Sequence, residues 1–371
     1  MFSKRFVDGS SDNRPAYAGP FAGALRSKKV IAGSLLTILL AVVLLAQILP
    51  RASGTSQTPS NSVELLNVSY DPTRELWRDI NEQFIASYER QSGVKLDIKQ
   101  SHGGSGTQAR AVIDGLDADV VTLALWSDTD AISRKGLIQP DWESRFPNKS
   151  LPYLSTIVFV VRQGNPKQIR DWGDLIQPGV EVVTPNPKTS GNGKLSFLAA
   201  WGSVRNRGGS EEDARKFVTE LYRHTPVLDT GARGATTTFA QKEIGDVHLT
   251  WENEAHLEVA EAGGALELVY PPVSIRAEPH VAVVDSNVER KGTRAAAEAY
   301  LTFLYTDAAQ ETIARHFYRP INESVLARHT KTFQPIELFS VTLVASDWNA
   351  AQEKFFADEA IFDSIYRPGS N

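Results

Sequence analysis

The chain has 371 residues, contains no cysteine and carries a formal net charge of −5 at pH 7. This length favours two lobes, each large enough to bury a core of its own. The lack of cysteine excludes disulfides, cysteine-ligated zinc, iron–sulfur clusters, a cysteine nucleophile and a lipid-modified N-terminal cysteine.

An uncharged apolar segment near the N-terminus has the length of a transmembrane helix. Residues 30–49 carry no charge, and a helix of that length spans roughly the 30 Å of a bilayer core. The leader before it, residues 1–29, has six basic and two acidic side chains, and this net charge of +4 favours a cytoplasmic position. The rest of the chain is therefore expected to be periplasmic or otherwise extracytoplasmic.

Residues 30–50 are expected to be either a transmembrane anchor or a cleaved signal segment. The sequence after the apolar run has no good small-x-small cleavage site, which favours an anchor. Residues 51–62 are rich in Ser, Thr and Pro, and this composition predicts a flexible linker. The chain after the leader carries −9, which is −5 less the leader's +4, so no long-range attraction to nucleic acid is expected.

From residue 63 onward, β-rich runs alternate with helical patterns. VELLNVSY is followed by Asp71 and Pro72, which are typical of an N-cap and of the first position of a helix. The Gly-rich turn around Ser105 opens a second helix, and ADVVTLAL is an apolar run of the kind buried in parallel sheets. Strands that alternate with helices predict the α/β fold class.

The same pattern predicts how the chain divides into lobes. Lobe I is expected at residues 63–155 and about 277–330, and lobe II at about 156–276. Residues 331–371 are expected to form helices that pack on the lobes. LELVYPP and EPHVAVVD are predicted strands, and both are candidates to return to the first lobe.

Four loops share one form, in which a strand leads through a turn rich in Gly, Ser or Thr into a helix start. The first N–H groups of a helix have no intrahelical partner, and the peptide dipoles place about half a positive charge there. One such loop is ordinarily an N-cap, but four at the carboxyl ends of strands favour an anion site. Glycines beside Ser105 would let its N–H and hydroxyl approach a small oxyanion. The loops are residues 69–71, 103–106, 189–192 and 231–234.

Several long motifs make the chain resemble the periplasmic sulfate-binding proteins of ABC importers, from about residue 63 to the C-terminus. They include LLNVSYDPTRELW, QSHGGSG, VVTPNPKTSG, VLDTGARGATTTF and GDVHLTWENEA. The resemblance implies a type II periplasmic-binding-protein fold, in which two α/β lobes close around a dehydrated sulfate in a cleft at the hinge. It implies a solute-binding protein and not an enzyme, with no cofactor, that delivers its ligand to ABC transporter permease subunits.

The resemblance also implies that the sulfate is held by neutral hydrogen-bond donors alone. Backbone N–H groups are expected from Asp71 and Ala232, the hydroxyl and N–H from Ser105, and the indole N–H from Trp251. A lone tryptophan in a strand is otherwise typical of a core. Arg233 is expected to support the site from behind, and the family usually has glycine where Asn192 stands. The implied ligands are Asp71, Ser105, Ser190, Gly191, Asn192, Ala232 and Trp251.

A site lined only by hydrogen-bond donors favours the binding of sulfate over that of hydrogen phosphate. Sulfate only accepts hydrogen bonds at pH 7, whereas the proton of hydrogen phosphate would leave a buried donor unsatisfied. The sequence does not decide between sulfate and thiosulfate as the main ligand.

The sequence offers weak signals for two other classes of function, an esterase and a membrane-anchored sensor. An esterase would use Ser105 as its nucleophile and His102-Gly103-Gly104 as an oxyanion loop, but Thr107 breaks the G-x-S-x-G pattern. A membrane-anchored sensor would need a cytoplasmic module, and residues 1–29 are too short and polar for one. His248 and His256 lie eight apart and are a weak metal signal, so no metal site is expected.

Overall fold

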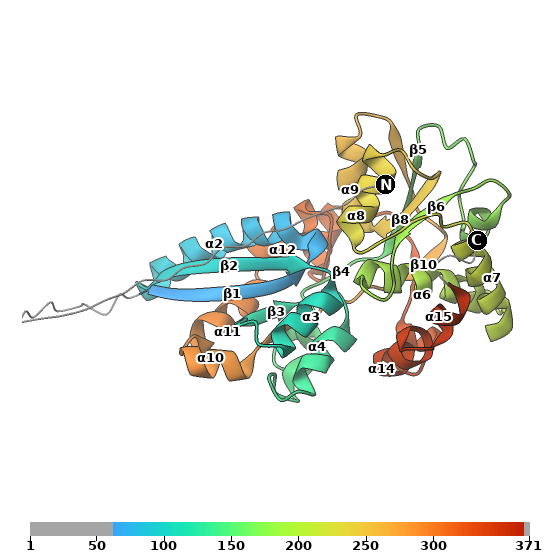
Figure 1. Cartoon of the computed structure of the whole chain (residues 1–371). Coiled ribbons are helices and arrows are strands. Elements are labelled where there is room, and N and C mark those ends of the chain that lie inside the picture. The colour runs from blue at the N-terminus through green and yellow to red at the C-terminus, as the bar shows by residue number, and fades with distance from the viewer. Residues whose placement is uncertain (1–61, 367–371) are drawn as a thin grey trace, which may run out of the picture. The chain divides into compact units, whose positions relative to one another are not determined.

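The computed structural model describes residues 62–366 (Figure 1). The predicted leader (residues 1–29), the predicted membrane segment (residues 30–50) and nearly all of the predicted linker lie outside the described residues. Within residues 62–366, no helix combines the length and the hydropathy that a bilayer crossing requires.

The first sheet has the strand order β11-β3-β1-β2. β1 runs parallel to β2 and β3, and β11 runs antiparallel to β3. Tyr70 lies opposite Gly103, and Ser69 lies opposite Thr122, so three parallel strands end at one edge. The elements are β1 (Ser62–Tyr70), α2 (Arg74–Ser92), β2 (Lys95–Gly103), α3 (Ser105–Ile113), β3 (Val120–Thr122), α4 (Trp126–Ser133) and β11 (Val281–Val283).

The start of α2 differs from the sequence prediction. Asp71 does not cap the helix; it begins the 3-10 turn η1 (Asp71–Thr73), and its Oδ1 accepts a hydrogen bond from Arg74 Nη2 at 2.7 Å. The neighbouring guanidinium takes the carboxylate away from the backbone N–H groups that a cap would serve. Pro72 fits the first turn, where a missing N–H breaks no helical bond. α2 ends at Gly93, whose φ of 69° favours glycine.

The second sheet has the strand order β7-β6-β8-β5-β9. β6 runs parallel to β7 and β8, whereas β5 runs antiparallel to β8 and β9. Together the two sheets and their helices confirm the predicted α/β class. The elements are β5 (Ile157–Arg162), β6 (Val182–Pro185), α6 (Gly191–Asn206), α7 (Glu211–Arg223), β7 (Leu228–Asp229), α8 (Ala232–Thr236), β8 (Val247–Trp251), α9 (Glu252–Glu261) and β9 (Leu266–Val269).

One strand assignment from the sequence is wrong. LELVYPP contains β9, which pairs with β5 in the second sheet and does not return to the first. Gly263 and Gly264 have φ values of 56° and 93°, so the chain reverses directly after α9 and lays β9 on β5. EPHVAVVD contains β11 and does reach the first sheet. The lobe boundaries themselves stay a prediction.

The chain crosses between the sheets twice, and the two crossings are bonded to each other. Ser155 N donates to Ala277 O at 3.1 Å, and Ala277 N donates to Ser155 O at 2.9 Å. The Thr156 hydroxyl donates to Ile275 O at 2.8 Å. Beside them, β4 (Tyr153–Leu154) pairs with β12 (Arg319–Pro320), and β10 (Val273–Ile275) pairs with β13 (Glu337–Phe339). These hydrogen bonds and strand pairs join the two halves where the chain crosses between the sheets.

The C-terminal third packs aromatic side chains on both halves. Phe84 of α2 lies 5.2 Å from Tyr300, and Phe197 of α6 lies 5.6 Å from Phe355, both measured between ring centroids. Each buried ring of this kind contributes about 1.5–3 kcal/mol through burial. The remaining helices are α10 (Asp285–Lys291), α11 (Arg294–Phe303), α12 (Asp307–Arg315), α13 (Glu323–Arg328), α14 (Trp348–Ala351) and α15 (Ile361–Ile365).

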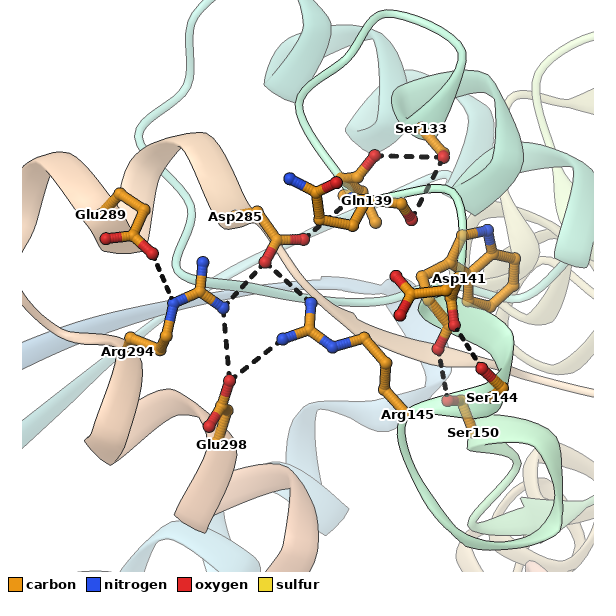
Figure 2. Close-up of polar contacts among 12 residues, drawn as sticks. Ser133, Gln139, Asp141, Ser144, Arg145, Ser150, Asp285, Glu289, Arg294 and Glu298 are labelled. Atoms are coloured by element: carbon orange, nitrogen blue, oxygen red, sulfur yellow. Dashed lines mark hydrogen bonds and ion pairs between the residues drawn. The ribbon is translucent and has the colours of Figure 1, made fainter.

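A buried carboxylate ties the start of α10 to the segment before β4 (Figure 2). Asp285 accepts hydrogen bonds from Arg145 Nη1 at 2.7 Å, Arg294 Nη1 at 2.8 Å and Gln139 N at 2.8 Å. Glu298 Oε1 bridges the same two guanidinium groups at 3.0 and 3.2 Å. Burial works against the charged carboxylate, but these donors together lower the pKa of Asp285.

We expect Asp285→Ala to lower the free energy of unfolding by about 2–4 kcal/mol, because Arg145 and Arg294 lose their most buried acceptor and share only the half-exposed Glu298. Urea denaturation at pH 7 measures the change. Asp117→Ala is the matched control, since its ion pair with Arg290 is largely exposed and its loss should stay within about 1 kcal/mol. Equal losses in the two variants would contradict this account of the Asp285 cluster.

Candidate functional site

A small cavity lies where the carboxyl edge of the first sheet meets the helix starts of the second half. The structure brings all seven sequence-predicted ligand residues to this one cavity. Their contact with an anion stays a prediction. The lining residues are Tyr70, Asp71, Pro72, Gly103, Gly104, Ser105, Ala124, Ser190, Gly191, Asn192, Ala232 and Trp251.

Backbone N–H groups at four chain turns are the main polar feature of this cavity. α3 begins at Ser105, α6 at Gly191 and α8 at Ala232, while Asp71 begins η1. Among the described residues, none of these four N–H groups, nor that of Asn192, donates to a protein acceptor. The starts of α3 and α6, the longer helices among these turns, also carry about half a positive charge from their aligned peptide dipoles. The cavity is therefore built to receive hydrogen-bond acceptors that carry negative charge.

Two side-chain donors complete the set. Trp251 ends β8, is 1% exposed and lies 5.4 Å from the Tyr70 ring between centroids, so it belongs to the core and also lines the cavity. Its indole N–H has no protein acceptor within residues 62–366. Ser190 caps α6: its Oγ accepts from Gly193 N at 3.4 Å, which leaves its hydroxyl proton for another partner.

Ser105 departs from the prediction in one respect. Its hydroxyl donates to Asp128 Oδ2 at 2.5 Å and accepts from Ala124 N at 3.0 Å, so its single proton is already used inside the protein. Only the Ser105 N–H is left for a ligand, and the expectation of a hydroxyl donor there is wrong. Sequence reasoning missed Asp128, although its place in WSDTD, directly after the strand ADVVTLAL, puts it at the same sheet edge.

Asn192 keeps its side chain away from the cavity. Its Nδ2 donates to Leu249 O at 3.3 Å, and its Oδ1 accepts from the Ser196 hydroxyl at 3.4 Å. The side chain is thus held between α6 and β8. Replacing the family's usual glycine with asparagine therefore leaves the N–H of this position directed as the other helix-start donors are.

Glycines let the two halves touch around the cavity. A Cβ on Gly191 would lie 2.8 Å from the Ala124 Cβ, and a Cβ on Gly104 would lie 2.6 Å from Thr189 O. Real Cβ atoms do not approach other atoms this closely, so only glycine allows this contact between the halves. The structure therefore corresponds to a closed arrangement of the two halves.

No lysine, arginine or histidine is among the residues that line the cavity. Arg233 follows Ala232 but turns away: its Nη2 donates to Glu75 Oε2 at 2.9 Å, and its Nε lies 2.8 Å from Glu254 Oε2 without pointing its N–H at that oxygen. Burial alone would lower the pKa of Arg233, but these two carboxylates raise it. Burial raises the pKa of Glu254 to about 8, against a smaller lowering by Arg233.

The rival readings find little support in this geometry. The His102 ring bonds Gln100 Oε1 at 2.7 Å and Tyr70 O at 3.4 Å, whereas the Ser105 hydroxyl bonds Asp128. His248 pairs with buried Glu258 at 2.9 Å, whereas His256 bonds the Tyr270 hydroxyl. Residues 62–366 contain no cluster of three or more His, Cys, Asp or Glu side chains that could hold a metal.

Two α/β halves with a donor-lined cavity between them have the architecture of a protein that binds a small solute. Residues 77–319 match the model of the bacterial extracellular solute-binding proteins. The chain belongs to this family.

Known relatives cover most of the chain. The chain is 50% identical over 306 residues to a thiosulfate-binding protein of Pseudomonas aeruginosa, covering 82% of this chain and 92% of the relative. It is 50% identical over 308 residues to a sulfate-binding protein of Escherichia coli, covering 82% and 94%. Among solved structures, the sulfate-binding protein SubI from Mycobacterium tuberculosis H37Rv matches with a TM-score of 0.72 at 31% identity, covering 79% of this chain and 99% of that one. The resemblance seen in the motifs is confirmed.

The raised pKa of Glu254 predicts how the stability of the protein changes with pH. Because its pKa is about 8 in the folded protein and near 4.5 when unfolded, the folded chain holds an extra proton between these values, so stability falls as pH rises from 4.5 through 8. Glu254→Gln should flatten this fall by a few kcal/mol, on the order of the 1.4 kcal/mol per pKa unit that linkage gives. Urea denaturation from pH 5 to 9 in sulfate-free buffer measures it.

The matched control is Glu212→Gln, whose carboxylate is mostly exposed and should leave the pH profile of stability unchanged. Parallel profiles for the wild-type protein and Glu254→Gln would contradict the raised pKa of Glu254.

Proposed function

We propose that the protein is an extracytoplasmic solute-binding protein that captures sulfate in this cavity and delivers it to the permease of an ABC transporter. The observation that carries the proposal is the set of converging donors, five backbone N–H groups, one indole N–H and one hydroxyl, with no cationic side chain in the lining. Relatives named sulfate-binding proteins, at 50% identity, support the same ligand.

The donor set favours a fully ionised tetrahedral anion. Each sulfate oxygen accepts hydrogen bonds and none needs to donate one, so every N–H in the cavity gains a partner. Hydrogen phosphate would bring a proton against a donor, at a cost of about 1–3 kcal/mol for each buried group left unsatisfied. Selectivity would then come from protonation and not from size.

Thiosulfate is the second candidate ligand. The Pseudomonas aeruginosa relative, also 50% identical, is named a thiosulfate-binding protein, as is an Escherichia coli relative at 43% identity over 315 residues. Thiosulfate presents three oxygen atoms and one sulfur atom as acceptors to the same donors. Sulfur accepts hydrogen bonds weakly, so a cavity with a donor for each position should hold sulfate more tightly.

The wider setting follows from the same proposal. The fold is assigned to type II periplasmic binding proteins, with the crossings at Ser155 and Ala277 as the hinge between lobe I (residues 63–155 and about 277–330) and lobe II (about 156–276). Residues 30–50 direct the chain out of the cytoplasm, and retention of this segment would anchor the binding protein beside its permease.

Titration calorimetry of the purified protein with sulfate, thiosulfate, phosphate and molybdate tests the function. We expect saturable sulfate binding, weaker thiosulfate binding and no response to phosphate. Ser190→Asp should abolish sulfate binding because it places a carboxylate against the anion. Thr306→Asp is the control, since the exposed Thr306 caps α12 through Ala309 N as Ser190 caps α6 through Gly193 N, and Asp caps at least as well as Thr. Absence of heat with both sulfate and thiosulfate would contradict the proposal.

Gly191→Ala tests closure. The added Cβ would meet the Ala124 Cβ at 2.8 Å only when the halves are closed, so sulfate affinity should fall about 10-fold or more while stability without ligand stays the same. Gly173→Ala is the control, because nothing lies within 4 Å of its added Cβ. Calorimetry that gives Gly191→Ala the wild-type affinity would show that the closed contact is unnecessary for binding.

A further inference from the structure

One buried ion pair crosses between the two halves beside the cavity. Asp128 lies on α4 in the first half, and Lys194 lies on α6 in the second, with 3.8 Å between Asp128 Oδ1 and Lys194 Nζ. Their side chains are only 9% and 11% exposed. Both charges are therefore shielded from water in the closed arrangement.

Asp128 is also bonded to the start of α3. Its second oxygen, Oδ2, accepts the Ser105 hydroxyl at 2.5 Å, and the Ser105 Oγ in turn accepts from Ala124 N at 3.0 Å. These bonds fix the first residue of α3, whose N–H faces the cavity. One carboxylate oxygen of Asp128 thus contacts Ser105 in its own half, and the other pairs with Lys194 in the opposite half.

Lys194 is anchored on its own side. It lies two residues after Asn192, in the first turn of α6, and its Nζ donates to Gln352 Oε1 at 2.8 Å. Its position is therefore set by the same helix start that supplies the N–H groups of Gly191 and Asn192. Movement of α6 away from α4 would separate the ion pair and the ligand donors together.

We propose that Asp128 is a positioning residue that couples the orientation of Ser105 to closure of the two halves through its pairing with Lys194. This inference rests on the proposed function. In the open state water reaches both charges, so neither needs the other. In the closed state each buried charge requires its partner, because an isolated buried charge is costly. Removing one partner therefore penalises the closed state and should speed release of the anion.

Stopped-flow tryptophan fluorescence with sulfate tests this coupling. Lys194→Met and Asp128→Asn should each raise the dissociation rate about 10- to 100-fold, while the association rate changes less than about 3-fold. In the double variant, the dissociation rate should increase by less than the product of the two single increases, because the double variant leaves no unpaired charge. Lys194→Arg should restore a rate near that of the wild-type protein, which a variant with impaired folding would not do.

The matched control is Arg145→Met, which removes an ion pair of similar burial from within the first half: the side chains of Arg145 and Asp285 are 21% and 5% exposed. It should lower stability but leave the dissociation rate of sulfate unchanged. Multiplicative effects in the double variant, or slower association with unchanged dissociation, would overturn the coupling and leave the proposed function standing. Failure of the wild-type protein to bind sulfate or thiosulfate would instead overturn the proposed function, and this inference with it.

Discussion

The binding cavity depends on peptide N–H groups that helix geometry leaves without partners. α3, α6 and α8 each begin at the cavity, and the N–H groups of their first residues have no acceptor among the described residues. Burying such a group costs about 1–3 kcal/mol unless it finds an acceptor. Under the proposed function, bringing the two halves together would be unfavourable by itself and favourable around an anion that accepts from all of these groups. Ligand binding and closure would then be one equilibrium, with the anion selecting the closed state.

This equilibrium needs donors from both halves to approach within the diameter of one small ion. Gly104 and Gly191 stand where the halves touch, and any Cβ at either position would hold them apart. The crossings at Ser155 and Ala277, which the proposed function treats as the hinge, are joined by two mutual backbone hydrogen bonds. Gly104, directly before Ser105, leaves room for the carbonyl of Thr189 from the other half.

The sequence predicted the parts of the structure that depend on local periodicity or on long motifs. Alternating strands and helices gave the α/β class, and motif resemblance brought together residues as distant as Asp71 and Trp251. Without the motif, the sequence would predict Trp251 to be a core residue, and its burial confirms that it is one. Asp71 was misjudged as a cap because Arg74 competes for its carboxylate. The Ser105 hydroxyl was misjudged because its acceptor, Asp128, comes from the next helix and only tertiary packing brings the two together.

A cavity with donors and no cations also explains how an acidic protein can hold a dianion. The chain after the leader carries a net charge of −9, and ionic screening confines the effect of each exposed charge to about 8 Å at physiological salt. The helix-start dipoles act at contact distance, where they outweigh that background. A cation in the lining would strengthen binding of any anion, phosphate included, and would erase the discrimination that a proton on the ligand provides. Arg233 lies beside the cavity with its guanidinium committed to Glu75 and Glu254, so its charge is balanced within the protein and the choice of ligand is left to the neutral donors.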